Sequence, residues 1–330
     1  MSIYRHITAN LNYLDTEFFT TKNRDSKVQY KPGEYYGYEP SEENDKLISE
    51  LTGANAARNV IIRDVRCLSL YEQPRMDEHG FELISDDLGS IACNLYNAFD
   101  LTIEHSQPYV NEIEKMVTSI VEKRLTLKVK LVSVFDLAKR KSKSSDLNEI
   151  PLSFIHSDYT RSSGVERLQQ QVISNKDSLA PVSFKPLRNR FENEEELENY
   201  TNGKCRFLIV NLWRNADPNK FPISQDPLAV CDPRSVPNES LVNYEIRCSD
   251  GLSLYEYHVS GGKSDNDCKH HKWYYYSGMT VDECLIWISY DKDGTFSSVP
   301  HTAFSLPQNE SRERKSIEAR AFVFLEPWLM

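Results

Sequence analysis

Three side chains of this 330-residue chain have the types and spacing of a metal site. His156 and Asp158 stand two positions apart in FIHSDYT, and a further imidazole, His301, follows in VPHTAFSLP. Residues two apart on a strand project from the same face, so His156 and Asp158 can approach one metal ion together. Two imidazoles and one carboxylate leave the other side of a metal open, as in non-haem Fe(II) oxygenases. The three residues therefore predict an Fe(II) site, although an H-x-D tripeptide alone also arises by chance near a protein surface.

A basic strand follows the third candidate ligand. Arg314 lies 13 residues after His301, and Ser316 lies two residues further on, in RKSIEARAFVF. A dicarboxylate that chelates iron at one end needs a cation for its other end, and the planar fork of arginine binds carboxylate bidentately. Arg314 with Ser316 is our first choice for this anchor; Arg320 and Arg312 are its rivals. The alternative is a row of solvent-exposed charges on an edge strand.

Strand-like runs must position these side chains. They are residues 59–71, 127–136, 150–160 and 205–214, followed by NYEIRC, SLYEYHV, CLIWISYD and ARAFVFLE. Helical patterns of apolar residues occur at 109–125, 163–175 and 190–202. Many short strands with turn signals between them predict a mainly β fold: a double-stranded β-helix (jelly roll, cupin-like) core with flanking α-helices. A Rossmann fold, an NTPase and a hydrolase are disfavoured because G-x-G-x-x-G after a strand, the P-loop and G-x-S-x-G are absent from the sequence.

The chain divides into two parts of different character. Residues 1–57 are polar and rich in tyrosine, which predicts an N-terminal extension that acts as a lid or arm or is partly disordered. Residues 58–330 are predicted to form the jelly-roll domain. The formal net charge of −10 argues against nucleic acid and against an anionic membrane surface as partners. A spanning helix and a secretory signal are not expected, because a continuous apolar run of the required length is missing.

The seven cysteines are scattered and include no C-x-x-C pair, so neither a disulfide framework nor a structural zinc site is expected. This predicts a reduced, cytoplasmic protein. Cys268, His270 and His271 cluster in SDNDCKHHKW, but a fourth ligand is missing, and we reject a metal site there. The expected partner is a small-molecule substrate. A homodimer is suggested only by how common two-fold homo-oligomers are.

Eight motifs between residues 59 and 324 resemble one known family when they are taken in order. They are DEHGFEL (77–83), VFD followed by Arg140 (134–140), IHSDYT (155–160), VNLWRNA (210–216), DPLAVCD (226–232), WYYYSGMTVDECLIWISYD (273–291), PHTAF (300–304) and RKSIEARAFVF (314–324). Together they resemble the CmcJ/AsaB-like hydroxylase/desaturase family of Fe(II)/2-oxoglutarate-dependent oxygenases. The chain departs from the family at Lys315, where an acidic residue is usual, and at Asn215, where proline is usual. Residues 1–57 have no counterpart that we can name.

The resemblance implies roles for individual residues. His156, Asp158 and His301 would be the catalytic iron ligands, and 2-oxoglutarate and dioxygen would be co-substrates. An arginine on the last strand would anchor 2-oxoglutarate, which again points to Arg314 with Ser316 and then to Arg320. Arg214, which follows an apolar strand, could meet a co-substrate or substrate carboxylate, or could simply mark the end of that strand.

Four further residues are expected near the substrate. Tyr159 follows a candidate ligand, and Asn211 shares a strand face with Trp213 by period two; packing is the alternative for Tyr159. Phe322 and Phe324 should point into the barrel with Arg320, where they could wall an apolar pocket.

These features predict an Fe(II)/2-oxoglutarate-dependent oxygenase. It would oxidise an unactivated C–H bond of a small secondary-metabolism or amino-acid-like substrate by hydroxylation, desaturation or oxidative cyclisation, such as aziridine formation. Two alternatives stay open. A cupin-type metal dioxygenase without 2-oxoglutarate would need the three ligands but no arginine anchor. A non-catalytic jelly-roll binding protein would keep the barrel, but the complete set of ligands counts against it.

Overall fold

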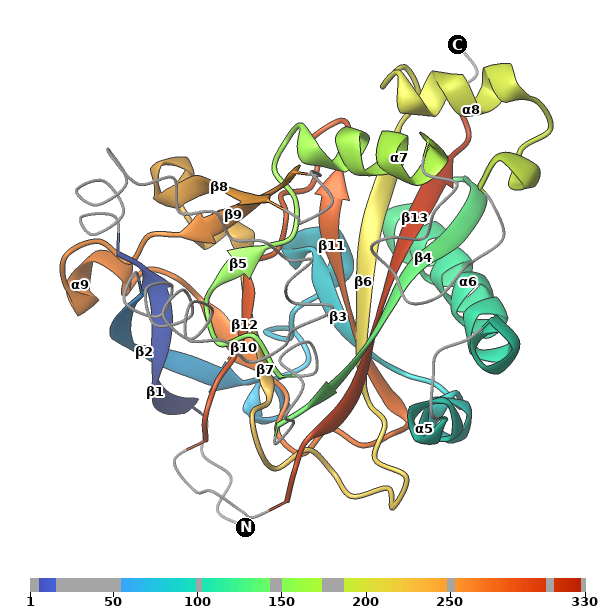
Figure 1. Ribbon diagram of the computed structural model, residues 1–330. Coiled ribbons are helices and arrows are strands. Elements are labelled where there is room, and N and C mark those ends of the chain that lie inside the picture. The colour runs from blue at the N-terminus through green and yellow to red at the C-terminus, as the bar shows by residue number, and fades with distance from the viewer. Residues whose placement is uncertain are drawn as a thin grey trace, which may run out of the picture.

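Two mainly antiparallel sheets lie face to face in the computed structural model, and helices cover the outer side of one of them (Figure 1). The structure describes residues 6–15, 55–98, 103–142, 150–173, 187–247, 253–306 and 312–327. The described part of the chain is therefore mainly β with flanking helices, and the predicted jelly-roll class is confirmed.

The larger sheet has eight strands in an order far from that of the sequence. Across the sheet they are β1 (His6–Leu14), β2 (Asn55–Asp64), β10 (Trp273–Tyr275), β7 (Leu228–Cys231), β12 (His301–Ala303), β5 (His156–Ser157), β9 (Ser253–Val259) and β8 (Leu241–Arg247). Only the pairing of β10 with β2 is parallel among these neighbours. Such an order brings segments from both halves of the chain to the centre of one sheet.

The smaller sheet has five strands, all antiparallel. In order they are β3 (Phe81–Ser85), β11 (Glu283–Asp291), β6 (Phe207–Asn215), β13 (Lys315–Leu325) and β4 (Val129–Lys141). Every residue of β6 is buried, because helices cover one face of this sheet and the larger sheet covers the other. A strand buried on both faces reads as a continuous apolar run, which is why residues 205–214 are so apolar.

The α-helices of the described part are α4 (Met76–His79), α5 (Gly89–Asn97), α6 (Ile103–Leu125), α7 (Ser163–Ile173), α8 (Glu194–Thr201) and α9 (Asp265–Cys268). The predicted apolar stripe of α6 packs on the five-stranded sheet, with Ile113, Val117 and Val121 fully buried. The helix begins before the predicted start, because Pro108 is accommodated inside it. Helices α7 and α8 cover the upper end of the same sheet in Figure 1.

Two expected boundaries differ from the structure. The strand expected over 150–160 is limited to β5. The strand expected over 59–71 ends at Asp64. The Asp64 side chain accepts a hydrogen bond from the backbone N–H of Arg66 and so caps the 3-10 turn that follows. Part of the expected extension, β1, pairs with β2 along its whole length. The expected boundary between residues 57 and 58 falls inside β2, and residues 16–54 lie outside the described ranges.

In the described ranges, no helix combines the length and apolar character needed to cross a membrane.

The packing of α6 predicts the effect of a core substitution. Ile113→Ala should lower the free energy of unfolding by about 2–5 kcal/mol, because it leaves a cavity between helix and sheet. Urea denaturation followed by circular dichroism measures the change. Tyr71→Ala is the control, since Tyr71 is fully exposed and its loss should cost less than about 0.5 kcal/mol. Equal losses from the two variants would contradict this packing.

Candidate active site

His156, Asp158 and His301 meet between the two sheets. β5 and β12 are antiparallel neighbours, and their register sets His156 directly opposite His301. The two imidazole centroids are 4.4 Å apart, and one potential ligand atom from each of the three residues lies within 4.8 Å of the others. Strand pairing thus closes a sequence separation of more than a hundred residues and builds the three-residue cluster that the motifs predicted.

Backbone carbonyls orient both imidazoles. Nδ1 of His156 lies 3.1 Å from the carbonyl oxygen of Phe154, and Nδ1 of His301 lies 3.0 Å from that of Val299. A carbonyl can only accept, so each Nδ1 carries a proton and each Nε2 is the ring nitrogen left to bind a metal. Burial, and then the neighbouring His301, lower the pKa of His156 to about 4, so this imidazole is neutral near pH 7. Neutral, oriented imidazoles are the form that a metal binds.

The carboxylate of Asp158 is held from the opposite sheet. Its Oδ2 accepts from Asn211 Nδ2 at 2.9 Å and from the Ser289 hydroxyl at 3.2 Å, and its Oδ1 accepts from Arg320 Nη2 at 3.1 Å. Oδ2 also lies 3.7 Å from His301 Nε2. Burial raises the pKa of Asp158, but the Arg320 guanidinium and the two histidines outweigh it and lower the pKa, so the group is ionised.

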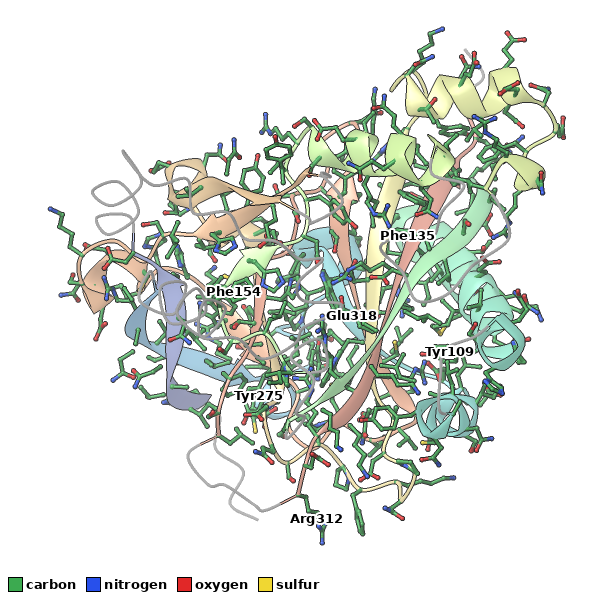
Figure 2. All side chains as sticks on the ribbon, in the orientation of Figure 1. Tyr109, Phe135, Phe154, Tyr275, Arg312 and Glu318 are labelled. Atoms are coloured by element: carbon green, nitrogen blue, oxygen red, sulfur yellow. The ribbon has the colours of Figure 1, made fainter. Side chains whose placement is uncertain are left out.

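Asn211 is part of this support rather than an open substrate contact. It is fully buried, its Oδ1 lies 2.8 Å from the Ser289 hydroxyl, and its Nδ2 also reaches Glu318 Oε1 at 3.1 Å. Figure 2 shows Glu318 in the space between the sheets. The prediction that Asn211 faces the substrate is therefore corrected: its amide is occupied by Asp158, Glu318 and Ser289. Ser289 was missed, although a serine inside the apolar run CLIWISYD is a usable signal.

Both Nη atoms of Arg320 are occupied by carboxylates of the chain itself. Besides Asp158, its guanidinium pairs with Asp136 and, at 2.7 Å, with Glu318. These three partners leave no donor pair for a dicarboxylate, which removes Arg320 as an anchor. Asp136 was not singled out in the sequence, because only the register of β4 against β13 reveals that it faces Arg320.

Arg214 lies on the wrong face of the five-stranded sheet. Side chains alternate along β6, so Asn211 faces the His–Asp–His cluster whereas Arg214 faces the helices. There its guanidinium donates two hydrogen bonds to Asp86 and lies 5.8 Å from the Tyr109 ring of α6. Figure 2 shows Tyr109 on the helix-covered side, away from Glu318. The prediction that Arg214 meets a bound carboxylate is wrong for this reason.

Arg314 and Ser316 have the character of an anion site. Arg314 Nε donates to the Ser316 hydroxyl at 3.0 Å and its Nη1 to the carbonyl of Asp226 at 2.6 Å, while the guanidinium lies 5.0 Å from the Trp213 ring. The side chain is buried, yet no described carboxylate forms an ion pair with it. Burial lowers the pKa of Arg314 to about 9, so it remains a cation near neutral pH. The rival Arg312 is exposed and stacks on Phe221 at 4.2 Å.

The three predicted aromatic contacts belong to the protein core. Phe322 stacks on Phe135 with centroids 4.2 Å apart, and Phe324 packs edge-on against Phe191 and Tyr200. Both phenylalanines lie on the same sheet face as Arg320, as predicted, but both are fully buried. Tyr159 is also buried, in edge contact with Tyr290. None of the three lines an open pocket in this structure, because α7 and α8 close that end of the sheet.

Two facing, mainly antiparallel sheets with a His–Asp–His cluster between them define a double-stranded β-helix protein with a site of the non-haem iron type. The chain belongs to the family described as Oxidoreductase/YMDC permease-like domain, whose model matches residues 17–324.

Individual relatives agree with this assignment. Hydroxylase/desaturase CTB9 of Cercospora beticola is 27% identical over 330 residues, which covers 93% of this chain and 90% of the relative. Hydroxylase/desaturase efuI of Hormonema carpetanum is 41% identical over 138 residues, 38% of this chain and 43% of that protein. Hydroxylase/desaturase asaB of Aspergillus flavus is 36% identical over 134 residues, 37% of this chain and 57% of the relative. These names confirm the resemblance that the ordered motifs carried.

Among solved structures, a variant of the iron and alpha-ketoglutarate-dependent endoperoxidase NvfI superimposes with a TM-score of 0.67. The match covers 98% of this chain and 99% of that chain at 17% sequence identity. At this identity the likeness establishes the jelly-roll fold.

The hydrogen bonds to Asp158 predict a metal-affinity defect in Asn211→Ala. Losing groups that orient a ligand typically costs about 10- to 100-fold in metal affinity, and Ser289→Ala should shift affinity in the same direction. Calorimetric titration with Co(II) measures the effect. Asn215→Ala is the matched control, because Asn215 lies on the same strand but donates to the carbonyls of Phe221 and Met279. Unchanged Co(II) affinity in Asn211→Ala would contradict its positioning role.

Proposed function

We propose that this chain is an Fe(II)/2-oxoglutarate-dependent oxygenase that oxidises an unactivated C–H bond of a small secondary-metabolism substrate. The most direct support is the combination of three converging ligands with Arg314, a buried guanidinium that lacks a carboxylate partner among the described residues. A metal site alone would not require this second feature. The hydroxylase/desaturase names of the relatives support the same class of reaction.

The ligands suit ferrous iron. Two imidazole nitrogens and one carboxylate oxygen form a mixed set without thiolate, which favours Fe(II) over metals that prefer cysteine. His156, Asp158 and His301 would hold the iron, and Arg314 with Ser316 would bind the far carboxylate of 2-oxoglutarate. When bound, these groups supply the oxidising chemistry with dioxygen.

The chain's own task is orientation and exclusion of water. Asn211, Ser289 and Arg320 keep Asp158 in one orientation and in its ionised form. The Trp287 ring lies 4.9 Å from the His301 ring and is fully buried, so it shields that ligand from solvent. A site built from strands on two packed sheets holds its groups more rigidly than one built on loops.

Two alternatives make different use of these residues. A cupin-type metal dioxygenase without 2-oxoglutarate would keep the ligands but would give Arg314 no co-substrate to bind. A non-catalytic binding protein would not need oriented, neutral imidazoles. The observed orientation of both histidines favours the proposed function over the non-catalytic binding protein. The burial of the Arg314 cation favours it over the dioxygenase that does not use 2-oxoglutarate.

The cellular location and the oligomeric state of the enzyme are also proposals. The free thiols of Cys93, Cys205, Cys231, Cys268 and Cys284 are the basis for placing it in a reducing compartment such as the cytoplasm. The hydroxylation, desaturation and cyclisation outcomes all stay within the proposal, and a homodimer stays a prediction.

Arg314→Ala should weaken 2-oxoglutarate binding by about 10- to 100-fold, because a hydrogen bond to a charged group contributes about 1.5–3 kcal/mol. Calorimetry on anaerobic, metal-loaded protein measures the binding. Arg314→Lys should recover part of the affinity through its charge. Arg312→Ala is the control and should bind like the unaltered protein, since Arg312 is exposed. Unchanged affinity in Arg314→Ala, with metal binding intact, would favour the dioxygenase that does not use 2-oxoglutarate.

Turnover provides the second test. The iron-loaded protein should release succinate when it is supplied with 2-oxoglutarate, dioxygen and a member of a panel of amino acids and pathway intermediates. Mass analysis of the consumed compound distinguishes a gained oxygen atom from the loss of two hydrogen atoms. His301→Ala should release none, while His270→Ala should match the unaltered protein, because His270 is exposed. Equal activity in these two variants would refute the assigned metal site.

A further inference from the structure

Asp226, in the loop before β7, has a left-handed backbone. Its φ angle is +45°, and the next residue is Pro227. A residue before proline is normally pushed toward extended conformations, and a positive φ is uncommon for any residue with a side chain. Such conformations persist only where the surrounding structure imposes them, and they are concentrated at ligand-binding sites. The backbone of Asp226 therefore needs a local explanation.

Two other described residues with side chains have a positive φ, and their places in the fold explain both. Thr126 (φ +54°) directly follows α6, where a left-handed residue commonly ends a helix. Lys220 (φ +56°) lies in a turn that its backbone N–H closes on the carbonyl of Asp217. Asp226 differs, because its carbonyl oxygen accepts from Arg314 Nη1 at 2.6 Å. The unusual backbone thus makes a contact with the proposed co-substrate anchor.

The loop around Asp226 is fixed on both sides. Before it, the Ile223 N–H donates to the Met279 carbonyl at 3.0 Å, and after it, the Phe304 N–H donates to the Pro227 carbonyl at 3.2 Å. The chain then enters β7, which pairs with β12. These bonds make the Asp226 carbonyl part of the framework of the larger sheet, so it is a fixed acceptor rather than the tip of a free loop.

Three contacts orient the Arg314 guanidinium. Its Nε donates to the Ser316 hydroxyl, its Nη1 donates to the Asp226 carbonyl, and its face lies over the Trp213 ring. The other terminal nitrogen, Nη2, has no acceptor among the described residues and is not enclosed by protein atoms. Nη2 is therefore the nitrogen of Arg314 that a bound carboxylate can reach.

Glu318 shows why this orientation matters. It follows Ser316 by two positions on the same face of β13, which is about 7 Å along the strand, and its charge acts on the Arg314 guanidinium. A guanidinium that was free to turn would gain by pairing with this carboxylate, and such an ion pair would compete with an anionic ligand. The Asp226 carbonyl is neutral, so it holds Arg314 without cancelling the positive charge.

We propose that Asp226 is a positioning residue whose left-handed backbone holds Nη1 of Arg314 and leaves Nη2 for the far carboxylate of 2-oxoglutarate. The group that acts is the backbone carbonyl and not the side chain. The inference rests on the proposed function, to which it adds a residue that works through Arg314.

Calorimetry of 2-oxoglutarate binding to anaerobic, Co(II)-loaded protein tests this role. Asp226→Val should weaken binding by about tenfold, because a β-branched residue disfavours the left-handed backbone and the charged hydrogen bond is lost. Asp226→Asn should bind like the unaltered protein, since asparagine tolerates this backbone while the carboxylate is removed. Lys220→Val is the matched control: it carries the same backbone penalty at a residue that does not bond to Arg314, and it should leave the affinity unchanged.

Thermal unfolding and Co(II) affinity separate positioning from general damage. Both valine variants should lower the melting temperature to a similar extent, and both should keep their affinity for Co(II). The inference is overturned if Asp226→Val binds 2-oxoglutarate like the unaltered protein, or if Lys220→Val loses as much affinity as Asp226→Val. It is also overturned if Asp226→Asn loses as much, which would assign the effect to the side chain, or if Asp226→Val loses Co(II) as well.

Failure of the proposed function would give a different result. In protein with isotope-labelled arginine, the Nε–H signal of Arg314 is identified in NMR spectra by its loss in Arg314→Lys. Without any 2-oxoglutarate, this signal should shift in Asp226→Val and stay in place in Lys220→Val. If the unaltered protein does not bind 2-oxoglutarate, the proposed function fails, while the signal still reports whether Asp226 holds Arg314. An unshifted signal in Asp226→Val overturns the inference.

Discussion

The buried carboxylate of Asp158 ties the two sheets together. It follows β5 of the larger sheet, but its hydrogen-bond donors, Asn211, Ser289 and Arg320, all come from the smaller sheet. A buried charge is tolerated only when it is paired and hydrogen-bonded, so these donors are a condition of the fold as well as of the site. An unsatisfied buried acceptor costs about 1–3 kcal/mol, which makes the distance between the sheets depend on this contact. The geometry of the His–Asp–His cluster therefore follows from how the sheets pack.

The arginines of the five-stranded sheet differ in their partners. Arg214 and Arg320 are neutralised by carboxylates of the chain, and their contribution is structural or positional. Arg314 is buried without such a carboxylate among the described residues. Because a desolvated, uncompensated cation is unfavourable, Arg314 marks the place where an anionic ligand gains most. Pairing, rather than position in the sequence, separates Arg314 from the other two arginines.

Asn215 and Lys315, the two departures from the family pattern, contact the loop after β6 and not the His–Asp–His cluster. Asn215 donates to the carbonyls of Phe221 and Met279, and Lys315 lies 3.8 Å from Asp217. Both residues thus contact the segment that follows β6. An asparagine at position 215 supplies donors that proline cannot, which gives this loop its own hydrogen bonds. The His–Asp–His geometry is held by other residues and does not depend on either departure.

The sequence by itself determined the class of fold, and it predicted the His–Asp–His cluster and the Arg314–Ser316 pair that the structure brings together. Each of these depends on local information: residue type, a spacing of two along a strand, and the number of short apolar runs. Only the tertiary structure decided the roles of Arg320, Asn211 and the aromatic residues of β13. Arg320 is occupied because Asp136 and Asp158 reach it from other strands, and Phe322 is core because Phe135 stacks on it. Such roles depend on partners that strand register and sheet packing bring from distant parts of the chain, and a residue's own neighbours in sequence do not encode them.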